Sequence, residues 1–291
     1  MNLRVATYNI HKGVSREFFG LRRVSRIHEL RARLHDLQAD MVFLQEVQGQ
    51  HQRNAQRFSQ WPSEPQDQFL ARSPKLAHTF QVAYGQSANY LHGHHGNALL
   101  SRFPILDLEN RDISDHALEK RGVLHCRVQI ETQVVHCFVI HFGLLSRSRE
   151  RQTQVVIDWV ERELPADAPL IIAGDFNDWR NKLSERLCER LGVREVFDAA
   201  RTRRKISERV RRFMLDRFSA AEPSAVKPAE DLRIGRIVRT ARTFPSLMPW
   251  LRMDRIYTRG FQVARARVLR GPQWAKLSDH SPLVADLTLL P

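Results

Sequence analysis

Short hydrophobic runs alternate along the chain with longer amphipathic stretches, and this alternation predicts an α/β protein. The run LIIAGDF, for example, is apolar from Leu170 to Ala173 and is typical of a buried strand. The predicted strands are residues 3–10, 40–47, 122–130, 134–142, 170–176, 251–260, 266–271 and 281–290, and 96–105 is predicted to be a strand followed by a turn. Residues 122–130 and 134–142 are separated by a short connection, so we expect them to form an antiparallel pair.

Two stretches have the spacing of apolar residues that is typical of an amphipathic helix. The first is 22–38 and the second is 148–163. Residues 50–95 are polar and interrupted by prolines, and we expect a helix and a loop over the sheet edge there.

The composition is that of a globular protein with a sizeable core. The chain has 291 residues, of which 42% are hydrophobic, enough for one large domain or two small ones. It has no apolar run of the ~20 residues that a membrane-spanning helix needs, and its first residues lack the apolar region of a signal peptide. Three cysteines (Cys126, Cys137 and Cys188) fit a reducing compartment. We therefore expect a cytoplasmic protein, with Cys126 and Cys137 in the core.

The net charge of +14 exceeds what solubility requires and favours a polyanionic partner, either nucleic acid or an anionic membrane surface. Residues 201–242 carry thirteen Lys or Arg and five Asp or Glu, so this segment supplies more than half of the net charge. Within it, 203–218 has the pattern of a basic amphipathic helix. Such a helix either packs its apolar face on the core or contacts a membrane or nucleic acid. If it contacts a membrane, the protein would be peripheral to the inner membrane face. Nothing in the sequence indicates an obligate protein partner.

Polar residues recur where the predicted strands end. They are Asn9, Glu46, His141, Asp175, Asn177, Asp254, Asp279 and His280. Any one of them could be a turn or cap residue, but open sheets place their binding sites at strand ends. Oxygen donors suit Mg²⁺ or Mn²⁺, and paired His and Asp suit proton transfer, so the set predicts hydrolysis of a phosphate ester. The chain has no GxSxG elbow for acyl transfer and no phosphate-binding loop of an NTPase.

Seven motifs follow one another in chain order: TYNI, LQEV, GNALLSR, VIH, GDFN, MDRIY and SDH. Together they resemble the endonuclease/exonuclease/phosphatase superfamily, which includes pancreatic-type deoxyribonucleases, apurinic endonucleases, neutral sphingomyelinases and inositol polyphosphate phosphatases. The segment GHHGNALLSRFPI is most similar to an uncharacterised bacterial branch of this superfamily. The resemblance implies a four-layer α/β sandwich, in which two packed mixed β-sheets are flanked by helices. It also implies a single domain over residues 1–291, with a basic helical segment or insertion at about 201–242.

The resemblance implies a metal site in which Glu46 is the principal Mg²⁺ ligand, Asn9 lies beside it and Asp279 is near the metal. Mn²⁺ is an expected substitute for Mg²⁺.

It also implies a catalytic set on the substrate side of the metal. Asp175 orients or deprotonates the attacking water, and Asn177 holds water and a phosphate oxygen. His280 contacts the scissile phosphate and pairs with Asp254. His141 stabilises the transition state or protonates the leaving oxygen.

Two further residues have weaker counterparts in the family. Arg121 is expected to contact phosphate, and Glu119 is the available candidate for the glutamate that supports the second histidine in pancreatic-type deoxyribonucleases. The predicted function is a Mg²⁺-dependent phosphodiesterase acting on DNA or RNA. The alternatives are a phospholipid or inositol-phosphate hydrolase at the membrane surface and a catalytically silent nucleic-acid-binding module.

Overall fold

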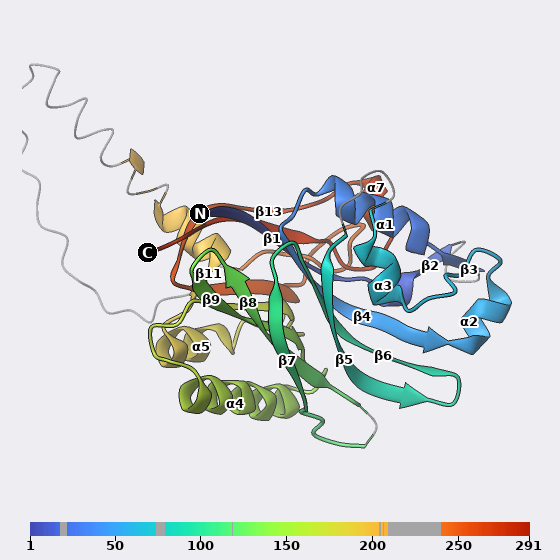
Figure 1. Cartoon of the computed structure of the whole chain (residues 1–291), viewed down its shortest axis with the longest axis horizontal. Helices are drawn as coiled ribbons and strands as arrows, with labels where there is room; N and C mark the ends of the chain where they lie inside the picture. The colour runs from blue at the N-terminus through green and yellow to red at the C-terminus, as the bar shows by residue number, and fades with distance from the viewer. Residues whose placement is uncertain (18–21, 74–78, 118, 204, 206, 209–239) are drawn as a thin grey trace, which may run out of the picture.

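Two six-stranded β-sheets pack face to face and carry helices on their outer faces, which gives the four layers of the predicted sandwich (Figure 1). The computed structural model describes residues 1–17, 22–73, 79–117, 119–203, 205, 207–208 and 240–291. Most of the basic segment 201–242, including most of the amphipathic stretch 203–218, therefore lies outside the described residues.

The first sheet has the strand order β13-β14-β1-β4-β6-β5. Its strands are β1 (Asn2–Asn9), β4 (Met41–His51), β5 (Gln81–Tyr90), β6 (Gly93–Ser101), β13 (Phe261–Val268) and β14 (Leu283–Leu289). Only β1 and β4 are parallel, and the other neighbours are antiparallel, so the sheet is mixed.

The second sheet has the order β11-β12-β10-β9-β8-β7. Its strands are β7 (Ile105–Asp112), β8 (Gly122–Ile130), β9 (Gln133–His141), β10 (Leu170–Asp175), β11 (Arg194–Glu195) and β12 (Asp254–Arg259). Here β9 and β10 form the parallel pair, and β8 and β9 form the antiparallel pair that the sequence predicts.

Helices cover both outer faces. On the first sheet lie α1 (Ile27–Asp36), α3 (Gln66–Ala71) and α7 (Pro272–Ala275); on the second lie α4 (Ser146–Glu163) and α5 (Ser184–Leu191). The remaining short elements are η1 (His11–Gly13), β2 (Val14–Glu17), β3 (Arg22–Ser25) and α2 (Gln52–Arg57). None of the helices in the described residues is long and apolar enough to span a membrane.

Three local predictions were wrong. The strand predicted at 266–271 is instead β13, which spans Phe261–Val268. Helix α1 begins at Ile27 rather than at residue 22, because residues 22–25 form β3 and pair with β2, where Val14 faces Ser25. In the 50–95 stretch, the structure adds the strand β5, which pairs with β6 at the edge of the first sheet. An edge strand is half exposed, so its polar side chains give a weak hydrophobic signal.

The core between the sheets is apolar and contains both strand cysteines. Cys126 and Cys137 are buried and unpaired there, as predicted. Polar side chains also join the two sheets. Near one end, the Nδ2 of Asn97 in β6 donates to the carbonyl oxygens of Gly122 (2.8 Å) and Val139 (3.3 Å) in the second sheet. Asn97 therefore helps the apolar core to hold the two sheets in one alignment.

Candidate active site

The predicted site residues converge at one end of the sandwich. Asp175, the last residue of β10, lies opposite His141 in the parallel strand β9 and opposite Asp254 in the antiparallel strand β12. These three side chains come from the second sheet. The first sheet contributes Asn9 at the end of β1, Glu46 in β4, and the pair Asp279 and His280 just before β14.

Asp175 is the centre of a buried hydrogen-bond network. Its Oδ2 accepts from Asn9 Nδ2 at 3.1 Å, and its Oδ1 accepts from the backbone N–H of Asn177 at 2.9 Å. The Nε2 atoms of His141 and His280 each lie 3.7 Å from Oδ2. Burial raises the pKa of Asp175 to about 6, against the lowering effect of the His280 charge. This carboxyl group can therefore exchange a proton near neutral pH.

His280 is held as the charged partner of two carboxylates. Its Nδ1 is 2.8 Å from Oδ2 of Asp254. Burial disfavours the imidazolium, but the charges of Asp254 and Asp175 outweigh burial and raise the pKa of His280 to about 10. In contrast, burial and the nearby charge of Arg121 hold the pKa of His141 well below its ordinary value. The two histidines on either side of Asp175 thus differ in charge at neutral pH.

Glu46 offers an oxygen that suits a divalent cation. It sits at a bulge of β4 with a φ of 57°, a strained value for a residue other than glycine. Its Oε2 is buried without a hydrogen-bond donor, and the nearest cation is Lys12, whose Nζ lies 3.4 Å away. Burial opposes ionisation, but the charges of Lys12 and His11 lower the pKa of Glu46. An ionised oxygen without a donor, beside an ammonium group, fits a metal ligand.

Two other oxygen donors lie near this position. Asp279 Oδ1 is 3.3 Å from His11 Nδ1, and Asn9 Oδ1 accepts from the backbone N–H of His11 at 3.1 Å. Burial disfavours the charge on Asp279, but the hydrogen bond from His11 and the charge of His280 lower its pKa to about 2. The Asp279 charge also acts on the pKa of Glu46, so the two carboxylates are close enough to interact. The donor set is hard and anionic, as Mg²⁺ prefers.

A second set of donors could also hold a metal ion. One ligand atom each from Asp175, Asp254 and His280 lies within 4.8 Å of the others. However, His280 Nδ1 and Asp254 Oδ2 are already joined by a hydrogen bond, which favours a proton-carrying pair over a metal site. Among the described residues, Glu46 Oε2 and Asp254 Oδ1 are both buried without a hydrogen-bond donor. Glu46 is the better candidate because, unlike Asp254, it is not committed to a hydrogen bond with a histidine.

Backbone strain is concentrated around the same centre. Positive φ values occur at His11 (45°), Lys12 (62°), Glu46 (57°) and Asn177 (50°). Each costs free energy for a residue with a Cβ atom, so tertiary contacts must hold these side chains in place. Strain of this kind is typical of functional sites.

Two predicted residues, Arg121 and Glu119, make mainly structural contacts. Arg121 donates to the carbonyl oxygens of Lys120 and Phe142 and to Glu119 Oε1. Glu119 also accepts from the backbone N–H of Leu144, so it orients Arg121 and the loop after β9 rather than His141. The predicted contact of Arg121 with phosphate stays a prediction, supported by the effect of its charge on the pKa of His141.

The side chains of the loop after Asp175 have different partners. Asn177 turns back and donates its Nδ2 to the carbonyl oxygen of Phe142 at 2.9 Å. Phe176 packs edge to face on Phe142 and Tyr257 in the core. Asp178 accepts from the backbone N–H of Leu183 at 2.9 Å and pairs with buried Arg255 at 3.3 Å.

Three residues of the site were not predicted. His11 and Lys12 follow β1 in η1, and nothing in their sequence context distinguishes them from surface residues. His95 lies in the GHHGNALLSR motif; burial, followed by the charge of Lys12, lowers its pKa to about 4. Its position opposite Gln48 of β4 follows from the β4–β6 register, which the sequence does not reveal.

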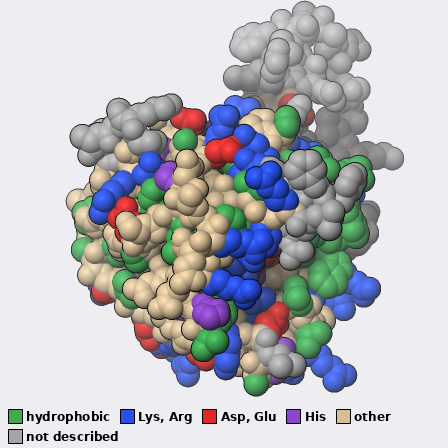
Figure 2. Space-filling model, turned by 90° about the vertical axis from the view of Figure 1, so that its right-hand side faces the viewer, with side chains coloured by type: hydrophobic (Ala, Val, Ile, Leu, Met, Phe, Trp, Pro, Cys, Tyr) green, Lys and Arg blue, Asp and Glu red, His purple; other side chains and the backbone are tan. Residues whose placement is uncertain are grey.

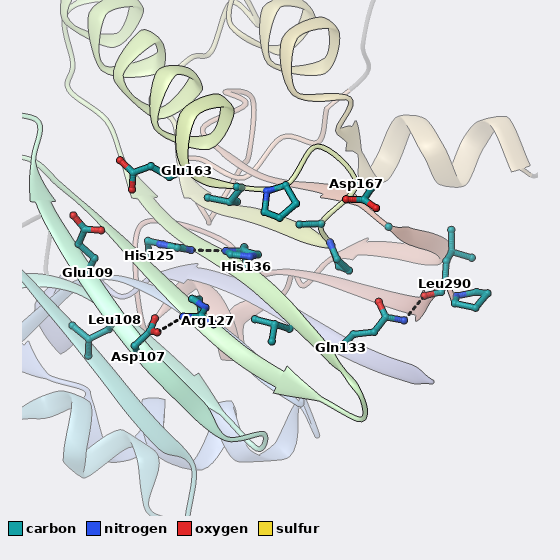
Figure 3. A pocket seen from close by; sticks show the side chains of 17 residues that line it. Asp107, Leu108, Glu109, His125, Arg127, Gln133, His136, Glu163, Asp167 and Leu290 are labelled. Carbon is teal, nitrogen blue, oxygen red and sulfur yellow. Dashed lines mark hydrogen bonds and ion pairs between the residues drawn. The ribbon is translucent and has the colours of Figure 1, made fainter.

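A wide cavity of about 1090 Å³ lies at the other end of the sandwich, where both chain termini lie (Figures 1 and 3). It is lined by the first residues of β9, such as Gln133, whereas His141 ends the same strand at the candidate site. His125 and His136 face one another there at 3.0 Å, and Arg127 pairs with Asp107 at 2.7 Å. This cavity is therefore separate from the candidate active site.

The sequence model of the endonuclease/exonuclease/phosphatase family matches residues 6–280. The uncharacterised protein YbhP of Escherichia coli K12 is 36% identical over 290 residues, which cover 99% of this chain and 97% of YbhP. The chain therefore belongs to the endonuclease/exonuclease/phosphatase family, whose members are divalent-metal-dependent phosphoesterase hydrolases.

Solved structures of the family share the fold at low sequence identity. The TDP2 protein of D. rerio, complexed with a single-strand DNA product, matches with a TM-score of 0.60 and 15% identity, covering 99% of each chain. The mannosyl-6-phosphatase Bt3783 of Bacteroides thetaiotaomicron matches with a TM-score of 0.62 and 15% identity, covering 99% of this chain and all of that one. The same fold thus occurs in proteins that act on different phosphate esters, and the substrate must be argued from the site.

Proposed function

We propose that this protein is a divalent-metal-dependent phosphodiesterase that cleaves nucleic acid. The observation that carries the proposal is the arrangement around Asp175: a buried carboxyl group with a pKa of about 6 lies 3.7 Å from His280 and from His141. A proton acceptor and two histidines around one point are the groups that hydrolysis of a phosphodiester requires.

Asp175 accepts the proton of the attacking water. Asn9 and the backbone of Asn177 each donate a hydrogen bond to one of its oxygens and hold the carboxylate in one orientation. Its pKa near 6 is low enough for ionisation at neutral pH and high enough for the carboxylate to act as a base.

His280 stabilises the negative charge that develops on the phosphate oxygens. Asp254 fixes the ring through Nδ1, which leaves the Nε2 proton available to the substrate. His141 lies on the other side of Asp175 and is neutral, so it is suited to hydrogen bonding with the leaving oxygen. Arg121 and Asn177 are proposed to contact the phosphate.

Glu46, Asn9 and Asp279 would hold Mg²⁺, for which Mn²⁺ can substitute. The ion would supply Lewis-acid stabilisation of phosphate charge. The donor-free oxygen of Glu46 supports this assignment.

The decisive experiment compares three substrates with purified protein and Mg²⁺ or Mn²⁺. We expect hydrolysis of bis(p-nitrophenyl) phosphate and of single-stranded DNA or RNA, slower hydrolysis of the monoester p-nitrophenyl phosphate, and loss of all activity with EDTA. Activity on the monoester alone would refute the phosphodiesterase assignment, and activity undiminished by EDTA would refute the metal requirement.

A second candidate is hydrolysis of a phospholipid headgroup at a membrane surface. Exposed apolar side chains flank the site: Leu144 and Leu145 follow β9, and Leu247, Met248 and Trp250 lie in the loop that contacts Asp279. Such a rim is typical of proteins that dock on lipid. Cleavage of vesicle phospholipid, with no cleavage of DNA or RNA, would favour this candidate.

A further inference from the structure

A basic cleft of about 320 Å³ opens beside the candidate active site. Its described lining residues are Lys12, Arg23, Gln48, His51, Arg53, Asn54, Arg57, Tyr90 and His92, and none of them is acidic. The cleft lies on the side of the molecule that carries β2, β3 and α2 (Figure 1), and Lys and Arg side chains gather across the centre of this face (Figure 2). Its charge therefore suits an anionic ligand.

The cleft is continuous with the catalytic centre through two elements. Lys12 lines the cleft, and its Nζ is 3.4 Å from Oε2 of Glu46. Strand β4 carries Glu46, followed by Gln48 and His51 on the wall of the cleft. A ligand group in the cleft would therefore be a near neighbour of the phosphate at the metal position.

Hydrogen bonds hold the neutral polar side chains of the cleft in defined orientations. Asn54 donates its Nδ2 to Gln48 Oε1 at 3.0 Å and its backbone N–H to His51 Nδ1 at 3.0 Å. Because Nδ1 accepts, the proton of neutral His51 resides on Nε2, and the amide group of Gln48 also remains a donor. The cleft thus presents donors as well as positive charge, as phosphate oxygens require.

Two arginines and an exposed aromatic ring complete the cleft. Arg53 and Arg57 are one turn apart on α2 and share a face of that helix. Tyr90 stacks on His95 with ring centroids 5.2 Å apart, and 40% of Tyr90 remains exposed. An exposed aromatic ring beside cationic side chains is a common arrangement for a single strand, whose bases stack while its phosphates are neutralised.

We propose that the basic cleft binds the phosphate next to the scissile one along a nucleic acid strand, with Arg53 and Arg57 as its principal contacts. The inference rests on the proposed function and adds a requirement: the preferred substrate carries at least two successive phosphates. The absence of acidic side chains among the described lining residues, the fixed donors and the continuity with Glu46 support a strand over an isolated phosphate ester.

The test measures two quantities for the Arg53→Ala/Arg57→Ala protein. One is kcat/KM on a single-stranded oligonucleotide relative to bis(p-nitrophenyl) phosphate, which has one phosphate. The other is the salt dependence of oligonucleotide binding in EDTA, followed by fluorescence anisotropy. We expect the kcat/KM ratio to fall by about tenfold or more, and the slope of log Kd against log salt to decrease by about 1.

The matched control is Arg194→Ala/Arg265→Ala, which removes the same charge from exposed positions on β11 and β13. It should leave the kcat/KM ratio and the salt slope unchanged. Equal losses in both double variants would attribute the effect to net charge and overturn the inference, as would equal losses on both substrates.

The outcomes separate this inference from the proposed function. A wild-type protein that fails to hydrolyse bis(p-nitrophenyl) phosphate refutes the proposed function. If wild-type protein hydrolyses it while Arg53→Ala/Arg57→Ala retains wild-type oligonucleotide binding and salt slope, only the cleft assignment fails. Vesicles containing phosphatidylinositol bisphosphate provide the last arm: binding that depends on these arginines for vesicles but not for DNA would overturn the strand assignment in favour of a lipid headgroup.

Discussion

The two ends of the sandwich each carry a cavity, and the cavities differ in size and in the state of their charges. At the end where the termini lie, the cavity of about 1090 Å³ contains acidic groups with nearby arginines: Asp107 pairs with Arg127 at 2.7 Å, and Glu163 with Arg111 at 2.8 Å. At the other end, the basic cleft of about 320 Å³ adjoins carboxylates with shifted pKa values and a strained backbone.

On the proposed function, the smaller cavity is the one beside the catalytic residues, so cavity size would not locate the active site. In an exposed ion pair, each partner largely neutralises the charge of the other, so little net charge remains to act on a ligand. Glu46 Oε2 also has a cationic neighbour, Lys12 Nζ at 3.4 Å, but it accepts no hydrogen bond and so retains lone pairs that suit a metal ion. The contrast predicts that substitutions at the Asp175 end lower the catalytic rate or the metal affinity. Substitutions at the end where the termini lie should change only the stability of the fold.

The largest expected effect comes from replacing one histidine at each end of the sandwich by alanine. His280→Ala should lower kcat on bis(p-nitrophenyl) phosphate by at least ~100-fold, because it removes the positive charge next to Asp175. His136→Ala, at the other cavity, should stay within about twofold of wild type. Steady-state kinetics with circular dichroism as a folding control provide the measurement. Comparable losses in the two variants would abolish the distinction between the ends.

The next effect concerns the metal. Glu46→Gln keeps the size of the side chain but replaces the charged oxygen, and it should raise the Mg²⁺ concentration for half-maximal activity about 10–100-fold. Isothermal titration calorimetry with Mn²⁺ gives a readout independent of turnover. Asp107→Asn at the other end is the matched control. Unchanged metal affinity in Glu46→Gln would move the ion to the Asp175, Asp254 and His280 set.

The pH dependence should follow Asp175. A base must be ionised to act, and burial raises the pKa of this carboxyl to about 6, so kcat/KM should fall about tenfold per pH unit below pH 6. The acidic limb should persist in His136→Ala, since that residue is remote from the site. A profile that remains flat down to pH 5 at saturating metal would exclude Asp175 as the base.

The smallest effect is on stability and involves no catalytic residue. Burial raises the pKa of Glu195 on β11 from 4.5 to about 8, so the folded state binds this proton more tightly than the unfolded state. Stability from this group is therefore lost as the pH rises from about 4.5 to about 8. Glu195→Gln should remove that slope and stabilise the protein by about 1–3 kcal/mol at pH 8, since one pKa unit corresponds to about 1.4 kcal/mol. Denaturant unfolding at pH 5 and pH 8 measures it; an identical slope in both proteins would contradict the prediction.

Much of the fold and the site was predictable because strands and strand ends leave local signals. Buried runs such as LIIAGDF identify central strands, and the polar residue that closes such a run, here Asp175, lies at the end of its strand. The family motifs in order supplied the four-layer arrangement, which the two observed sheets confirm.

The remainder depends on contacts between distant segments. Lys12 resembles any surface lysine in sequence and reaches Glu46 only because η1 folds back with consecutive positive φ angles at His11 and Lys12. His95 joins the site through the register of β6 on β4, and strand β5 is too polar and too exposed to give a clear pattern. Register and loop geometry are set by tertiary packing, which short-range periodicity does not contain.

The side chain of Asn97 has a consequence for how the protein loses activity. The site is divided between the two sheets, with Glu46, Asn9 and His280 on one and Asp175, Asp254 and His141 on the other, and Asn97 ties the sheets together near that end. A small sliding of one sheet over the other would separate the proposed base, Asp175, from the proposed metal ligand, Glu46, while the hydrogen bonds within each sheet stayed intact. The rate of substrate hydrolysis should therefore be sensitive to the alignment of the two sheets. During gradual unfolding, we expect this rate to fall before secondary structure is lost.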